Sequence, residues 1–150
     1  ASSNDAVVGE EFDVCGTHPT ATGSLHYHTT PLCLIGCLGG TVPATADWPF
    51  LEAVRAGNIR DWVAKWPATG TAVLLGYMLD GRKIYSPYDE AGNVHAWGGI
   101  FDGSASVKYG NTQYEGDFSD VRSRLDECNG AMRGGEYVYY ATPSPPWTPP

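Results

Sequence analysis

The sequence has few charged residues and no long apolar run, and both shortages narrow the possible functions. Asp, Glu, Lys and Arg make up 17% of its 150 residues, and the net charge is −8. An acidic chain is repelled by nucleic-acid backbones and by anionic membranes, so we expect neither as a partner. No run of 18 apolar residues occurs, so we expect no membrane span.

Common catalytic and modification motifs are also missing. The chain has no G-x-S-x-G, no H-E-x-x-H and no phosphate-binding loop. None of its asparagines begins an N-x-S/T glycosylation sequon. We therefore expect a protein that is not an enzyme, with metal-dependent catalysis as the alternative that the histidines leave open.

Glycine (19) and proline (11) are abundant, which favours turns and short elements over a helical bundle. The length fits one compact domain. We expect a mainly β fold with short helices (α+β), consisting of an arm at 1–12, a domain at 13–142 and a proline-rich tail at 143–150.

The clearest helical pattern is an insert at about residues 45–66. Near its end Trp62 and Trp66 fall on one apolar face, and Pro67 ends the helix. The spacing favours core tryptophans over a ligand platform.

Residues 72–85 read as two strands joined by a tight turn at Asp80-Gly81, a common hairpin dipeptide. Residues 86–120 are rich in turn residues and predict loops with short aromatic strands between them.

The four cysteines predict disulfides. An even cysteine count and a low lysine content favour an oxidising compartment, so we expect a secreted, extracellular or cell-surface protein. We expect two disulfides, and all three pairings remain open; zinc ligation through the C-x3-C spacing is the alternative. The candidates are Cys15, Cys33, Cys37 and Cys128.

Two distant segments share one pattern. Phe12–Pro31 and Leu125–Pro143 both read apolar-Asp-x-Cys, then glycine, then an alternating aromatic strand, then Thr-Pro. We expect two pseudo-equivalent aromatic strands, related by a rough twofold within one sheet system.

These segments, "CGTH…LHYH" and "DECNG…YVYY", together with "LLGYMLDGRKIYSPYDEAGN" at 74–93, resemble the YHYH-domain proteins. That family has a Cys-x-Gly-His stretch followed by Tyr-His-Tyr-His, usually in two copies. The resemblance covers about 12–40, 74–93 and 125–147, and it implies a secreted or envelope-associated, mostly β protein whose histidines suggest a metal site.

The chain departs from the family pattern in its second copy. Ala131, Val138 and Tyr140 stand where the first copy has His18, His26 and His28. The usual histidine before the central Leu-Gly strand is missing, and the insert at 45–66 is not part of the pattern.

The first copy could still bind metal. In a strand, His26 and His28 project to one face, with Tyr27 opposite, and His18 could approach across a turn. Three imidazoles suit copper or zinc, whereas structural, hydrogen-bonded histidines are the alternative. Calcium is a weaker expectation, at loop carboxylates and amides: Asp89, Glu90, Asn93, Asp117 and Asp120.

The two ends suggest an assembly role. An extended arm with the apolar patch Ala6, Val7 and Val8 could add a strand to a neighbour's sheet and build a filament by self-assembly. The tail should adopt a polyproline conformation, with candidate sites for O-linked glycans at Thr142, Ser144 and Thr148.

We therefore predict a non-enzymatic extracellular structural protein, a homo-oligomer or the subunit of a surface fibre or matrix. The alternative is a secreted protein that binds copper or zinc through its three clustered histidines.

Overall fold

The computed structural model describes most of the chain. The described residues are 12–45, 59–95, 106–109, 112–115, 125–126, 128–143, 147 and 149; for 59–60, 106–109 and 112–115 this covers the backbone alone. Several predictions lie outside this part: the arm up to residue 11, the first part of the helical insert at 46–58, and the candidates Ser144, Thr148, Asp117 and Asp120.

The described residues form a mainly β structure with short helices, as the composition indicates. The strands are β1 (Thr17–Pro19), β2 (Leu25–Tyr27), β3 (Leu74–Tyr77), β4 (Lys83–Tyr85), β5 (Ser106–Tyr109), β6 (Thr112–Glu115), β7 (Gly130–Arg133) and β8 (Glu136–Tyr140). The helices are α2 (Leu32–Cys37) and α4 (Ile59–Val63). No helix in the described part is long and apolar enough to cross a membrane.

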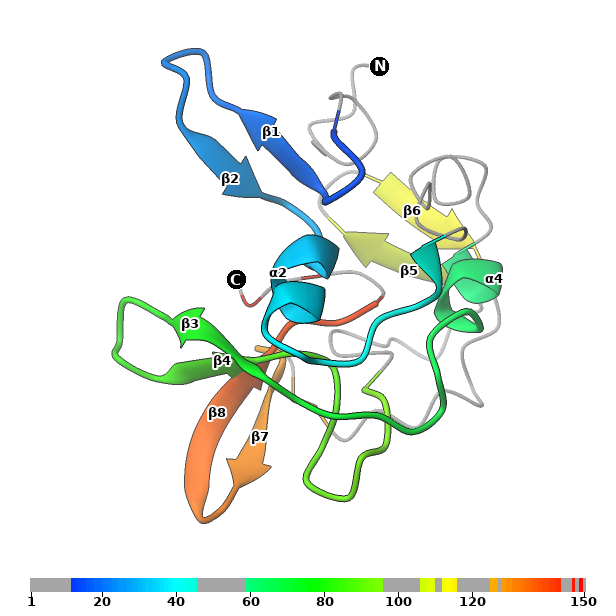
Figure 1. Cartoon of the computed structure of the whole chain (residues 1–150), viewed down its shortest axis with the longest axis vertical. Helices are drawn as coiled ribbons and strands as arrows, with labels where there is room; N and C mark the ends of the chain where they lie inside the picture. Colours follow the sequence, from blue (N-terminus) through cyan, green and yellow to red (C-terminus); the bar gives the residue numbers. More distant parts are fainter. Residues whose placement is uncertain are drawn as a thin grey trace.

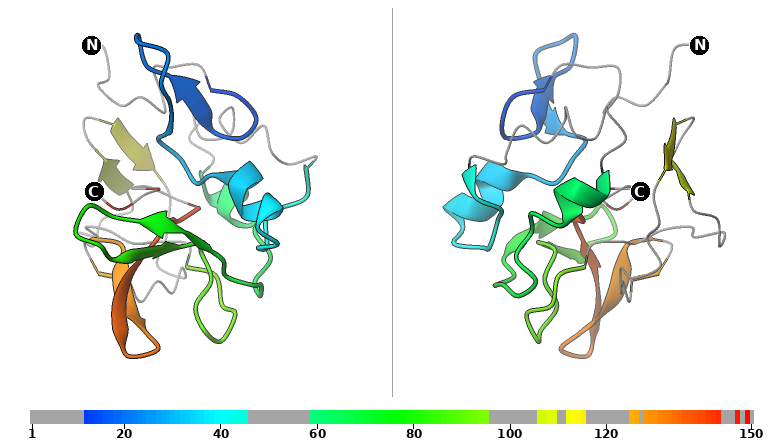
Figure 2. Two further views of the ribbon diagram at one scale, coloured as in Figure 1. Left: turned by 60° about the vertical axis from the view of Figure 1, so that its left-hand side comes forward. Right: turned by 90° about the vertical axis from the view of Figure 1, so that its right-hand side faces the viewer.

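Three sheets carry these strands. β1 and β2 form one antiparallel pair, β5 and β6 another, and the third sheet has the order β3-β4-β8-β7. The β1–β2 hairpin lies at one end of the molecule and the four-stranded sheet at the other, with α2 between them (Figures 1 and 2). The expectation of one sheet system for both aromatic strands is therefore wrong, because β2 and β8 belong to different sheets.

The central hairpin forms as predicted. β3 and β4 pair antiparallel around a turn in which Gly81 has φ +81°. The Asp80 carboxylate accepts a hydrogen bond from the Arg82 amide at 2.9 Å, which holds the turn. β4 then pairs in parallel with β8, so the central and the last hairpin share one sheet.

The core lies beside α2 and α4. Trp62 and Trp66 are each 3% exposed, and their rings pack edge to face, which confirms them as core residues. Within the second part of the expected helical insert, α4 ends at Val63, and Trp66 lies in the turns that follow it, so the helix does not run to Pro67. The core cluster is Leu32, Ile35, Trp62, Trp66, Tyr88 and Trp147.

Trp147, in the proline-rich C-terminal segment, does not have the expected polyproline conformation. Trp147 is fully buried, has φ +65° and accepts a hydrogen bond from the Thr142 amide at 2.8 Å. A positive φ is incompatible with polyproline geometry, and burial of a large aromatic ring outweighs the local preference. Thr142 is also fully buried, so it is wrong as a glycosylation site.

Candidate metal centre

The β1–β2 hairpin begins at an aspartate-centred turn. Asp13 Oδ1 accepts hydrogen bonds from the amides of Cys15 and Thr17, both at 2.9 Å, and Oδ2 accepts one from the Thr17 hydroxyl at 2.6 Å. Gly16 adopts φ +81°, which glycine tolerates without strain. Desolvation works to raise the pKa of Asp13, but the hydrogen bonds outweigh it and hold the pKa below its ordinary value.

The register of the hairpin places the three histidines on one face. His18 in β1 lies directly opposite His26 in β2. His28 follows His26 by two residues and so projects to the same side. Tyr27, between them, is 39% exposed on the other side. The predicted convergence of the three imidazoles is confirmed as geometry.

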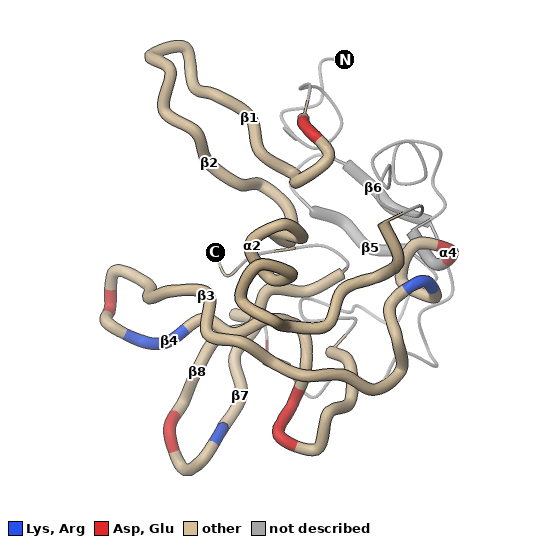
Figure 3. Tube along the Cα trace, viewed as in Figure 1, with Lys and Arg blue, Asp and Glu red and all other residues tan. Residues whose placement is uncertain are grey.

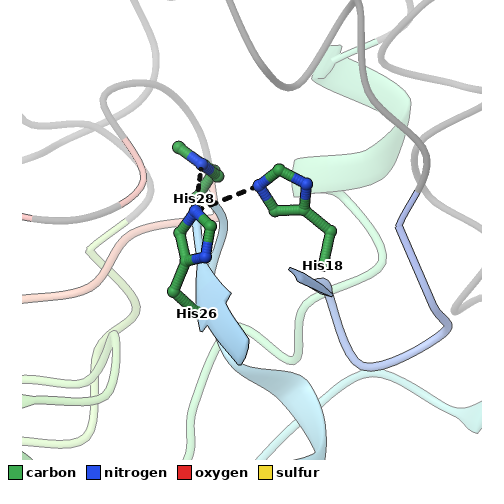
Figure 4. Close-up of side chains that lie close together, drawn as sticks. All are labelled: His18, His26 and His28. Carbon is green, nitrogen blue, oxygen red and sulfur yellow. Dashed lines mark hydrogen bonds between the residues drawn. The ribbon is translucent and has the colours of Figure 1, made fainter. Parts of the chain in front are cut away.

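The Nε2 atoms of His18 and His28 both lie beside Nε2 of His26 (Figure 4). His26 Nε2 lies 2.8 Å from His28 Nε2 and 3.1 Å from His18 Nε2. One nitrogen from each ring lies within 4.8 Å of the others, and all three residues are half-buried.

Hydrogen bonds between the rings do not explain why the three nitrogens lie so close together. A neutral imidazole nitrogen carries either one proton or one lone pair in the ring plane, yet His26 Nε2 faces two other Nε2 atoms. A metal ion would accept all three lone pairs at once. Zinc–nitrogen bonds of about 2.0–2.1 Å in a tetrahedron would place ligand nitrogens roughly 3.3 Å apart, close to the two distances that His26 Nε2 makes here.

The described segment around the cluster is aromatic and carries no charge between residues 14 and 45. The Phe12 ring lies 4.8 Å from the His18 ring and meets the His28 ring edge-on at 6.0 Å. Residues 14–46 contain no Asp, Glu, Lys or Arg, and Figure 3 shows β1, β2 and the turn between them in the colour of uncharged residues. Between Cys15 and Cys33 the hairpin therefore offers imidazole nitrogens, and no carboxylates, as side-chain ligands.

Phe12 was not foreseen as part of this site. Its only signal in the sequence is its place directly before Asp13, where the second copy has Leu125.

One disulfide closes the segment that holds the cluster. Cys15 and Cys33 are bonded, with a sequence separation of 18, and all three histidines lie between them. A loop of this length restricts the unfolded chain by about 3 kcal/mol in the entropy model. The expectation of two disulfides is wrong: Cys37, exposed at the end of α2, and Cys128, half-buried before β7, are free thiols.

The β7–β8 hairpin begins at the same kind of turn. Asp126 Oδ1 accepts hydrogen bonds from the amides of Cys128 and Gly130 at 2.9 and 2.8 Å. Asn129 has φ +59°, in the place of Gly16. Here Oδ2 accepts its hydrogen bond from the Tyr137 hydroxyl at 2.6 Å.

The equivalent face of the second hairpin belongs to the core. Ala131 pairs with Val138 in the register, as His18 pairs with His26. Val138 is 2% exposed, and Tyr140, at the place of His28, is 1% exposed. The face that carries half-exposed imidazoles in one hairpin is thus buried and apolar in the other.

Two other residues with possible ligand atoms, Asp89 and His95, serve other contacts. The Asp89 carboxylate accepts hydrogen bonds from the backbone amide and the side-chain amide of Asn93 at 2.8 and 3.0 Å. Both bonds lie within one turn, so this carboxylate has a structural role there. His95 is 4% exposed and packs edge-on against Tyr140 at 4.7 Å, away from the histidine cluster.

Comparison with known proteins identifies one family. A family model described as YHYH protein matches residues 2–150, including the insert at 45–66 that the sequence pattern had left outside the resemblance. No curated protein and no solved structure matches the chain significantly.

Proposed function

The chain belongs to the YHYH protein family, and we propose that it binds one divalent transition-metal ion, zinc or copper, through His18, His26 and His28. The observation that carries this proposal is the meeting of three Nε2 atoms, with His26 at 2.8 and 3.1 Å from its two neighbours. Imidazole nitrogen suits both metals, and copper is expected to bind more tightly than zinc.

The second hairpin supports a functional role for the imidazoles. It forms the same turn and the same register with alanine, valine and tyrosine at the corresponding positions. The hairpin therefore does not need histidine for its backbone structure. The three imidazoles are half-exposed and do not fill the core, so a structural role does not explain them and a role as metal ligands does.

The proposal is tested by metal titration of the chelator-treated full chain, followed by calorimetry and elemental analysis. We expect one equivalent of zinc or copper per chain. The variant His26→Ala should lose this uptake, whereas His95→Gln should retain it, because His95 lies outside the cluster. Uptake below a tenth of an equivalent after loading would contradict the proposal.

Assembly into an extracellular fibre through Ala6, Val7 and Val8 stays a prediction, because the arm lies outside the described residues. Size-exclusion chromatography and negative-stain microscopy, with and without residues 1–12, test it. A strict monomer under all conditions would contradict it.

We also propose an extracellular or cell-surface location. The Cys15–Cys33 disulfide supports an oxidising compartment.

A further inference from the structure

The histidine hairpin has little strand pairing to hold it. β1 and β2 are three residues long each, and within the described residues they pair only with one another. An isolated two-stranded hairpin is marginally stable in water. β8, by contrast, pairs with both β7 and β4. The first hairpin therefore depends on some other support.

The disulfide supplies that support. Cys15 lies two residues before β1, and Cys33 lies in α2, between the fully buried Leu32 and Ile35. The bond thus ties the start of the hairpin to a helix that is fixed in the core. Two described hydrogen bonds also reach this base. The Thr30 hydroxyl donates to the Thr142 carbonyl, which ties only the β2 side. The Thr29 hydroxyl donates to the Gly16 carbonyl on the β1 side at 3.5 Å, which is at the weak limit of such bonds.

We propose that the Cys15–Cys33 disulfide is a redox clamp that sets the metal affinity of the histidine cluster. This inference rests on the proposed metal-binding function. The clamp opens when a low-molecular-weight thiol reduces it. Two thiol molecules become one disulfide, the Sγ–Sγ bond of the protein breaks, and Cys15 and Cys33 each gain one electron and one proton.

Reduction lowers affinity because the three ligands come from both strands. With the clamp closed, the strands already hold the imidazoles in binding geometry. With the clamp open, the hairpin is less ordered before the metal binds. Part of the binding free energy is then used to order the two strands, so the observed affinity is lower. By linkage, a metal that prefers the clamped form stabilises the disulfide by the same factor.

Calorimetric titration with zinc chloride tests the clamp on the full chain. We expect the oxidised chain to bind at least tenfold more tightly than the reduced, desalted chain and than Cys15→Ser/Cys33→Ser. Cys37→Ser is the matched control, because it makes the same change in the same helix without touching the disulfide, and it should stay within twofold of the oxidised chain.

The outcomes separate the two proposals. Zinc binding by the oxidised chain that is unchanged or stronger after reduction would overturn the clamp and leave the metal centre standing. No zinc or copper binding by the oxidised chain would overturn the metal centre itself.

A second measurement takes its deciding outcome from the wild-type chain, so that outcome does not depend on the folding of a variant. The wild-type chain is equilibrated in a glutathione redox buffer with free zinc fixed by a metal buffer, and alkylation with mass spectrometry counts the freed thiols. Saturating zinc should shift the equilibrium at least tenfold toward the disulfide, and His26→Ala should show no such shift. No shift in the wild type, or a shift toward the thiols, would overturn the clamp.

Discussion

The β1–β2 and β7–β8 hairpins start from the same aspartate turn and keep the same register, but they are supported differently. The second is joined to a third strand and buries Val138 and Tyr140. The first has no third strand in the described part, is tied by a disulfide, and leaves His26 and His28 half-buried. A hairpin whose inner face is not needed for the core is free to carry ligands there, and the predictions below test this division of roles.

The largest expected effect on stability is the difference between Tyr140 and His28, which occupy equivalent positions in the two hairpins. Tyr140→Ala should lower the free energy of unfolding by about 3–4 kcal/mol, because it empties a core site of an aromatic ring. His28→Ala in metal-free protein should cost less than about 1 kcal/mol. Urea denaturation followed by circular dichroism measures both, and equal losses would show that the two faces play the same structural role.

The next effect separates binding from stability. His26→Ala removes a direct ligand, so it should weaken zinc binding more than about 100-fold. Loss of a residue that only hydrogen-bonds a metal ligand usually weakens metal binding by about 10- to 100-fold. Its counterpart Val138→Ala should lose about 2 kcal/mol of stability through a core cavity but leave zinc affinity within twofold. The same calorimetric and urea experiments apply, and a large affinity loss in Val138→Ala would break the comparison.

A smaller effect is expected where the two turns differ. Thr17 gives its own hydroxyl to Asp13, whereas Gly130, at the same place, leaves room for the Tyr137 ring, whose hydroxyl bonds Asp126. A Cβ at Gly130 would overlap the end of that ring. We expect Gly130→Ala to cost about 1–2 kcal/mol by displacing this charged hydrogen bond.

Gly76→Ala is the matched control in the same sheet, because an added Cβ there meets open space. Urea midpoints should show Gly130→Ala clearly below Gly76→Ala, and coincident midpoints would contradict the steric account.

The smallest expected effect is a pH dependence shared by both turns. Desolvation works to raise the pKa values of Asp13 and Asp126, but hydrogen bonds outweigh it, so both pKa values are lowered on folding. A depressed folded pKa gives stability that is present above the ordinary carboxyl range, near pH 4, and is lost as the pH falls through the folded pKa.

Metal-free protein should therefore unfold at lower urea concentration at pH 3 than at pH 6. Asp13→Asn and Asp126→Asn should each flatten this difference. An unchanged acid dependence in both variants would show that these carboxylates do not contribute it.

The site could be predicted from the sequence because its geometry is local. The spacing of His26 and His28 sets their common face, and the turn between β1 and β2, closed by the hydrogen bond from the Thr20 amide to the Ser24 carbonyl, brings His18 beside them. The strand alternation therefore identified His26 and His28, and the turn expected before them added His18.

The disulfide and the tail could not be predicted because they depend on distant packing. Cysteine spacing did not distinguish the pairings, and the bond formed where the hairpin base meets α2, with Cα atoms of Cys15 and Cys33 5.1 Å apart. The tail's proline content indicated an extended chain, but Trp147 fills the core instead. The parallel pairing of β4 with β8 likewise has no local signal.

The most direct test of the central claim is an X-ray absorption spectrum of the zinc-loaded full chain. We expect three imidazole nitrogens at about 2.0 Å from zinc and the loss of this signal in His26→Ala but not in Val138→Ala. A first shell made of sulfur, or of oxygen without imidazole, would contradict it.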